Sequence, residues 1–178
     1  LSDFQKTGAP ARWVQLSLVG FGERYPSLHD EIRFVEHSSH EVQQSTSPAE
    51  VLAMLLEGNS RFRVGEPLKR SMERQRTATA TGQHPLAVIL SCIDSRSPAE
   101  AIFDLGLGDV LSVRVAGNIT TEEVIGSIEF AAIVAGAKLV AVVGHTRCGA
   151  IESSVTNYCC PDQPLVPECV HAKGILRE

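Results

Sequence analysis

Residues 86–100 read LAVILSCIDSRSPAE. The run Leu86–Leu90 is short and continuously apolar, which is typical of a strand buried on both faces of a parallel sheet. Ser97-Pro98-Ala99-Glu100 then combines an N-cap residue, a proline at the first helical position and a glutamate three residues after the cap. The stretch therefore predicts a buried strand, a polar turn and the start of a helix that ends near Gly106.

The same pattern of apolar runs and helix starts recurs along the chain. Val110–Val115 is predicted to be a second strand, and Leu139–Val143 a third strand that is buried like the first. Between them, Thr120-Thr121-Glu122-Glu123 is a capping-box signature for a helix that we expect to end at Gly136. Another helix start, Ser47-Pro48-Ala49-Glu50, precedes the first strand. Strands that alternate with helices predict an α/β fold with a mostly parallel central sheet flanked by helices.

Residues 1–46 differ in sequence pattern from the rest of the chain. We predict them to be an N-terminal extension or linker, with the tail of a preceding domain as the alternative. Residues 14–18 alternate in polarity like a half-buried strand, and the polar residues 37–47 favour a linker. Residues 47–178 are predicted to form the main domain, and we expect its C-terminal part to be truncated because the last residues resemble the opening of a helix.

Composition narrows the classes of function. The chain has 178 residues, of which 43% are apolar and 21% charged, and this argues against a disordered chain. No apolar stretch approaches the ~18 residues that a membrane helix needs. A net charge of -5 argues against binding to nucleic-acid phosphates. Five cysteines are an odd number, so metal or thiol chemistry is favoured over a disulfide framework.

Reactive side chains follow the first and third predicted strands. Ligands of open α/β sheets bind at the carboxyl ends of the strands, where Cys92, His145 and Cys148 stand. His145 and Cys148 are three residues apart and can face one centre, and Cys92 can join them if the first and third strands are neighbours. Two thiolates and an imidazole suit zinc, and three protein ligands with an open fourth position are typical of a catalytic site.

These residues belong to motifs that resemble the β-class carbonic anhydrases, from about residue 47 to about residue 154. The resemblance implies zinc bound by Cys92, His145 and Cys148, and reversible hydration of CO2 to bicarbonate and a proton. It also implies a homodimer or higher oligomer with the active site near a subunit interface, and a first helix that ends around Gly58. The motifs that carry it are Ser91-Cys92-Ile93-Asp94-Ser95-Arg96, Gly106-Leu107-Gly108-Asp109, Arg114-Val115-Ala116-Gly117-Asn118 and Gly144-His145-Thr146-Arg147-Cys148-Gly149-Ala150.

The resemblance implies roles for residues beside the metal. Asp94 would accept a hydrogen bond that orients the attacking oxygen, and Arg96 would hold Asp94 in place as a planar fork. Alternatively, Asp94 would be a fourth zinc ligand that closes the site. Arg114 is a weaker candidate for contact with bicarbonate. Gly149 would let the following helix approach the metal, with ordinary close packing as the alternative.

Several alternatives stay open at this stage. A CS2 or COS hydrolase would share the fold and ligands, and an inactive zinc-binding module could regulate a sulfate or bicarbonate transporter. We expect a cytoplasmic location. Residues 1–46 also resemble the tail of a domain that follows such permeases, which gives the cytoplasmic side of a membrane-tethered fusion as the alternative. A second zinc site at Cys159, Cys160, Cys169 and His171 is conceivable, but a loop with incidental cysteines is favoured.

Overall fold

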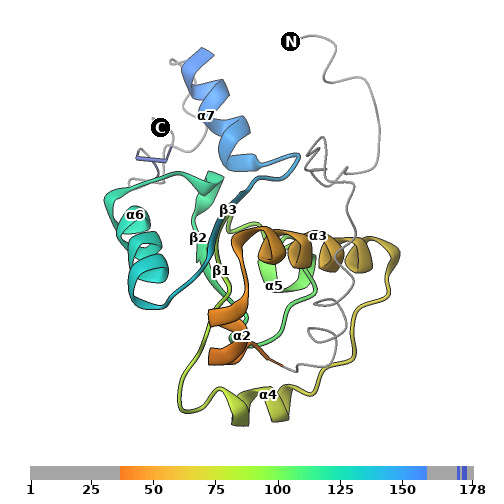
Figure 1. Ribbon diagram of the computed structural model, residues 1–178. Coiled ribbons are helices and arrows are strands. Elements are labelled where there is room, and N and C mark those ends of the chain that lie inside the picture. Colours follow the sequence, from red (N-terminus) through yellow and green to blue (C-terminus); the bar gives the residue numbers. More distant parts are fainter. Residues whose placement is uncertain (1–36, 160–171, 173, 176–178) are drawn as a thin grey trace.

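The computed structural model describes residues 37–159, 172 and 174–175, and its centre is a sheet of three parallel strands (Figure 1). The strands are β1 (Ala87–Ser91), β2 (Val110–Arg114) and β3 (Leu139–Val143), in the order β2-β1-β3. The described helices lie between and around these strands. The predicted α/β class with a parallel central sheet is therefore confirmed.

The strands are paired in phase. Ser91, the last residue of β1, is opposite both Arg114 at the end of β2 and Val143 at the end of β3. The carboxyl ends of all three strands therefore lie side by side, and so do the first residues of the segments that follow them. These segments contain the candidate ligands.

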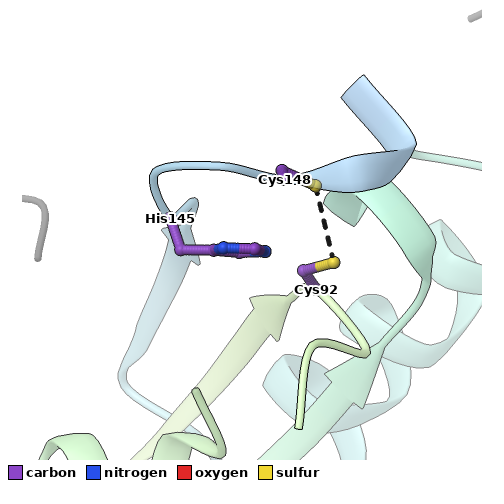
Figure 2. Close-up of side chains that lie close together, drawn as sticks. All are labelled: Cys92, His145 and Cys148. Carbon is purple, nitrogen blue, oxygen red and sulfur yellow. Dashed lines mark hydrogen bonds between the residues drawn. The ribbon is translucent and has the colours of Figure 1, made fainter. Parts of the chain in front are cut away.

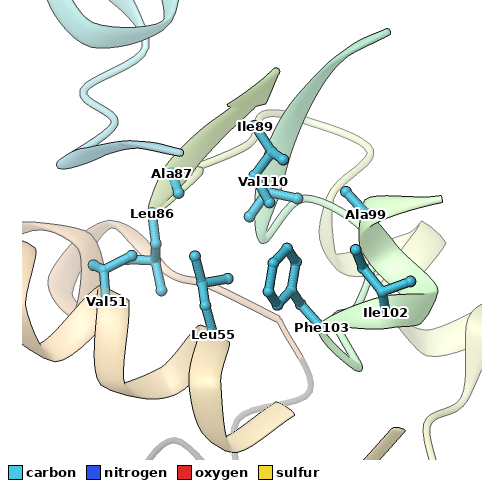
Figure 3. Close-up of a cluster of buried hydrophobic side chains, with 9 residues drawn as sticks. All are labelled: Val51, Leu55, Leu86, Ala87, Ile89, Ala99, Ile102, Phe103 and Val110. Carbon is cyan, nitrogen blue, oxygen red and sulfur yellow. The ribbon is translucent and has the colours of Figure 1, made fainter. Parts of the chain in front are cut away.

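The central strand carries the hydrophobic core. Every residue of β1 is buried, as the continuous apolar run predicted. One face of the sheet packs against helix α3 (Pro48–Val64) and the short helix α5 (Ala99–Ile102), as Figure 3 shows. The core residues are Val51, Leu55, Leu86, Ala87, Ile89, Ala99, Ile102, Phe103 and Val110.

Strand β3 is covered on one face only in the described part of the chain. Leu139, Ala141 and Val143 pack against the core, whereas Val140 and Val142 are 46% and 59% exposed. The prediction of a buried strand is therefore wrong for one face of β3, because the described residues leave Val140 and Val142 largely uncovered.

Helix α3 begins as predicted but extends further. Ser47 and Glu50 form the reciprocal capping box, and Gly65 ends the helix in a left-handed conformation with φ 77°. The expected end near Gly58 is wrong, because the helix continues through this glycine. A Cβ atom at Gly58 would lie 1.8 Å from the carbonyl oxygen of Phe103, so the glycine permits a close approach of α3 to the end of α5.

Two later helices differ from their predicted starts. In α5 the cap residue is Pro98, because the Ser97 hydroxyl donates to the Asp94 carbonyl instead, and the helix ends at Ile102 rather than near Gly106. Helix α6 (Glu122–Glu129) is capped by Thr121, so no capping box forms from Thr120. The segment η2 (Phe130–Val134) continues it as a π-helix. Gly136, with φ 78°, follows the helical segment as predicted.

A further correction concerns the predicted linker. Residues His40–Ser45 form helix α2, and its Gln43 side chain is buried. The Gln43 amide donates to the carbonyls of Pro85 at 2.7 Å and Ala135 at 2.8 Å. The backbone N–H of Ser38 donates to the Asp109 carboxylate at 2.8 Å. Residues 38–46 therefore pack on the domain, while the predicted strand at 14–18 lies outside the described residues.

The remaining described helices lie at the periphery. Helix α4 (Met72–Ala78) is mostly polar, with Gln75 as its buried residue. The short turn η1 (Ala116–Asn118) follows β2, and helix α7 (Gly149–Cys159) follows the segment after β3. Among the described residues, no helix combines the length and the apolar character that crossing a membrane requires.

A buried ion-pair cluster joins α3 to the end of α5. The Asp104 carboxylate is 4% exposed and accepts hydrogen bonds from Arg61 and from Arg70. It also accepts a hydrogen bond from the Leu68 N–H. Burial acts to raise the pKa of Asp104, but these donors outweigh burial and hold the pKa below its usual value.

The contact between α3 and Phe103 predicts the effect of a methyl group at Gly58. Gly58→Ala should destabilise the fold by about 2 kcal/mol or more, because the added Cβ would meet backbone rather than a movable side chain. Gly126→Ala in α6 is the matched control, since its Cβ would meet nothing within 4 Å, and it should be neutral or stabilising. Urea unfolding of both variants measures the difference, and equal stabilities would contradict the packing argument.

The Asp104 cluster predicts a pH-dependent loss of stability. Because the folded-state pKa lies below the unfolded one, the ionised carboxylate stabilises the fold above the unfolded pKa. This stabilisation is lost as the pH falls through the folded-state pKa. Asp104→Asn should cost about 2 to 3 kcal/mol at pH 7, and its difference from the parent should shrink toward pH 3. Urea unfolding across this range tests it, with the exposed Glu129→Gln as control, and a constant difference would contradict the prediction.

Candidate metal centre

The in-phase strand ends bring three sulfur and nitrogen ligands together. Cys92 directly follows β1, whereas His145 and Cys148 lie between β3 and α7. One ligand atom from each residue lies within 4.8 Å of the other two. The sulfur atoms of Cys92 and Cys148 are 3.8 Å apart, and Figure 2 shows the His145 ring directed toward the two cysteines.

The chemistry of this group fits a metal ion. The Nε2 atom of His145 is buried and has no hydrogen-bond partner among the described residues. A buried polar atom without a partner requires an explanation, and a metal ion coordinated by this nitrogen and the two sulfurs provides one. The other ring nitrogen, Nδ1, lies 3.0 Å from the Thr146 carbonyl oxygen, a contact that orients a metal-binding imidazole.

The surroundings of Cys92 favour its thiolate. Burial acts to raise the pKa of Cys92, but the His145 ring and the backbone N–H groups of Asp94 and Gly117 lower it to about 7. The Gly117 N–H lies 3.4 Å from the sulfur. Burial acts to lower the pKa of His145, but the Cys92 sulfur, the Thr146 carbonyl and the Asp94 carboxylate outweigh it and raise this pKa.

Asp94 and Arg96 form the pair that the sequence predicted beside these ligands. Arg96 donates from Nε to one Asp94 oxygen at 3.0 Å and from a terminal nitrogen to the other at 2.7 Å. Its backbone N–H donates a third hydrogen bond at 2.9 Å. These contacts with Arg96 hold the pKa of Asp94 well below its usual range, so the carboxylate is ionised.

The carboxylate of Asp94 is near the ligand group but outside it. Its Oδ2 atom lies 3.8 Å from Nδ1 of His145. Among the described residues, the group that could hold a metal consists of Cys92, His145 and Cys148 without Asp94. In this arrangement Asp94 faces Arg96 instead of completing a fourfold ligand set.

Arg114 and Gly149 are the two weaker candidates for the site. The Arg114 guanidinium donates to the backbone carbonyls of Cys92 and Asp94, and contact with bicarbonate stays a prediction. Around Gly149, an added Cβ would meet nothing within 4 Å among the described residues, and the approach of this helix to the metal stays a prediction. Of the four residues of the conceivable second zinc site, which the sequence did not favour, only Cys159 is described, and it is exposed.

Gly117 belongs to one of the motifs quoted above, but the sequence assigned it no role in the site. Its N–H donates to the Cys92 sulfur, and its φ of 68° is in the left-handed region. An added Cβ would also lie 3.3 Å from the Cδ1 atom of Ile151 in α7. The available signal was a glycine in the turn after a parallel strand, because such glycines often allow backbone to approach a ligand closely.

Comparison with known proteins places this site in a family. Residues 87–174 match the family model described as carbonic anhydrase. Carbonic anhydrase 2 of Mycobacterium tuberculosis is 45% identical over 112 residues, which are 62% of this chain and 54% of the relative. The carbonic anhydrase of Mycolicibacterium smegmatis is 42% identical over 113 residues, which are 63% of this chain and 55% of the relative.

The chain spans about half the length of these curated relatives. A solved structure, the β-carbonic anhydrase CcaA, is 25% identical and covers 64% of this chain and 57% of that chain, with a TM-score of 0.46. The family assignment rests on the sequence matches, which include all three candidate ligands within residues 87–174. Residues 87–174 of this chain therefore belong to the β-class carbonic anhydrase family.

Proposed function

We propose that this chain catalyses the zinc-dependent, reversible hydration of CO2 to bicarbonate and a proton. The observation that carries the proposal is the Cys92, His145 and Cys148 group with an ionised Asp94 beside it. Thiolate and imidazole ligands in a set of three suit zinc with an open fourth position. Family membership supports the same reaction.

The residues around the ligands have separate tasks in this reaction. Zinc, when bound, supplies Lewis-acid activation of water near neutral pH. Asp94 accepts a hydrogen bond from the attacking oxygen and so orients its lone pair toward the carbon of CO2. Arg96 keeps Asp94 ionised and fixes the plane of its carboxylate through its planar fork.

The contacts of Asp94 favour an open site over a closed one. A carboxylate that accepts three hydrogen bonds from Arg96 loses them if it turns to become a fourth ligand. We therefore infer that the fourth position is available to water and substrate while the Asp94–Arg96 pair is intact.

Other predictions from the sequence are not needed for this proposal. Assembly into a homodimer or larger oligomer, a cytoplasmic location and fusion to a membrane transporter stay predictions. The division into an extension at residues 1–46 and a zinc domain at residues 47–178 also stays a prediction, apart from the packing of residues 38–46 described above.

Stopped-flow CO2 hydration tests the proposal directly. The zinc-loaded chain should accelerate hydration well above the buffer rate, and removal of the metal with a chelator should abolish the acceleration. Restoring zinc should restore it. A chain that carries one zinc per molecule without accelerating hydration would contradict the proposal, and parallel assays with COS and CS2 would then test the two hydrolase alternatives.

Asp94→Asn tests the orienting role. The amide keeps the shape of the side chain but loses the charge, so kcat/KM should fall roughly 10²-fold while the zinc content stays the same. The exposed Glu122→Gln variant is a matched control on helix α6 and should retain full activity. Full activity of zinc-loaded Asp94→Asn would rule out the orienting role.

A further inference from the structure

We propose that Arg114 is a positioning residue that holds the Cys92 ligand and the Asp94 carboxylate in register with each other. The inference rests on the proposed function for its catalytic consequence and on the structure alone for its effect on the metal site. Arg114 is the last residue of β2, directly opposite Ser91 at the end of β1. Its side chain therefore leaves the sheet beside the segment that carries both groups.

The Arg114 guanidinium bridges the backbone at these two residues. Nε donates to the Cys92 carbonyl at 3.1 Å, and a terminal nitrogen donates to the Asp94 carbonyl at 2.6 Å. A planar fork fixes the separation and the orientation of the two acceptors that it binds. The carbonyls belong to residues two positions apart, so the fork sets the shape of the turn between them.

The turn from Cys92 to Asp94 depends on side-chain hydrogen bonds such as those from Arg114, because the sheet ends before this turn. The last pairing of β1 with β2 is the hydrogen bond from the Val115 N–H to the Ser91 carbonyl, at 3.1 Å. Beyond it, the Ser97 N–H donates to the Asp94 carbonyl at 3.1 Å. Arg114 acts between these two points, where the ladder no longer constrains the backbone of Cys92.

Gly117 supports the same conclusion independently. Its N–H approaches the Cys92 sulfur at 3.4 Å from a point three residues beyond Arg114. The end of β2 and the turn η1 thus contact Cys92 twice, once at its carbonyl through Arg114 and once at its sulfur through Gly117. Such contacts outside the ligand set commonly change metal affinity 10- to 100-fold when they are removed.

The position of Arg114 at the end of β2 fits this role. A charged residue at the end of a half-buried strand needs partners for its donors. Arg114 finds them in carbonyls of the ligand-bearing turn, which places its charge beside the site without direct contact with a ligand atom.

The experiment compares Arg114→Ala and Arg114→Lys in the full chain, with the exposed Arg76→Ala as control. Three measurements apply to each: zinc affinity by chelator competition, the visible absorption spectrum of the Co²⁺-substituted protein, and kcat and KM for CO2 hydration. Arg114→Ala should bind zinc about 10- to 100-fold more weakly and shift the Co²⁺ bands. Its kcat should fall while KM for CO2 changes little, since the guanidinium donates to the two carbonyls of the turn.

Added guanidinium separates positioning from general stability. It should restore part of the zinc affinity and of the parent Co²⁺ spectrum to Arg114→Ala, and it should leave Arg76→Ala unchanged. If the alanine variant does not fold, Arg114→Lys carries the test. Lysine keeps the charge but offers a point donor instead of a fork, so zinc affinity should still fall about tenfold.

A folded Arg114→Ala or Arg114→Lys variant with the parent zinc affinity and the parent Co²⁺ spectrum would overturn the inference. Failure of the proposed function is distinguishable, because the zinc-loaded parent would then show no hydration while the affinity and spectral measurements would still report on Arg114.

Discussion

The metal centre depends on the register of three parallel strands. Cys92 and Cys148 are 56 residues apart in sequence, yet their sulfurs lie 3.8 Å apart because β1 and β3 pair in phase and end together. In a strand, a shift by one residue reverses the direction of every side chain. The hydrophobic packing of β1 against α3 and α5 is therefore also what brings the ligands to one point, and stability and chemistry share a single constraint.

Residues around the ligand set stabilise the negative charges of the site. Cys92 is surrounded by N–H groups and by the His145 ring, which favour the thiolate despite burial. Asp94 is kept ionised by Arg96, whereas Arg114 donates to two backbone carbonyls among the described residues. Arg96 and Arg114, which both contact the turn after β1, therefore have different roles. Arg96 sets the state of a side chain, and Arg114 constrains the backbone that carries it.

Local patterns in the sequence predicted the elements whose formation depends on local physics. The apolar run of β1, the capping box of Ser47 and Glu50, and the ligand positions after strand ends follow from burial and hydrogen bonding within a few residues. The errors lie where distant contacts decide. At Gly58, helix α3 passes close to the backbone of Phe103, and polar Gln43 is buried where its amide donates to two carbonyls. Arg114 likewise acquires its partners only through the pairing of β2 with β1.

The Gln43 contact has a consequence for the boundaries of this domain. Its amide joins Pro85 and Ala135, which lie just before β1 and a few residues before β3, at the edge of the sheet opposite the metal ligands. Helix α2 thus ties together the entrances of the two strands whose exits carry the ligands. The smallest unit that folds with its own polar groups satisfied has to include α2, and a fragment cut at the capping box of α3 would leave two interior carbonyls without their donor.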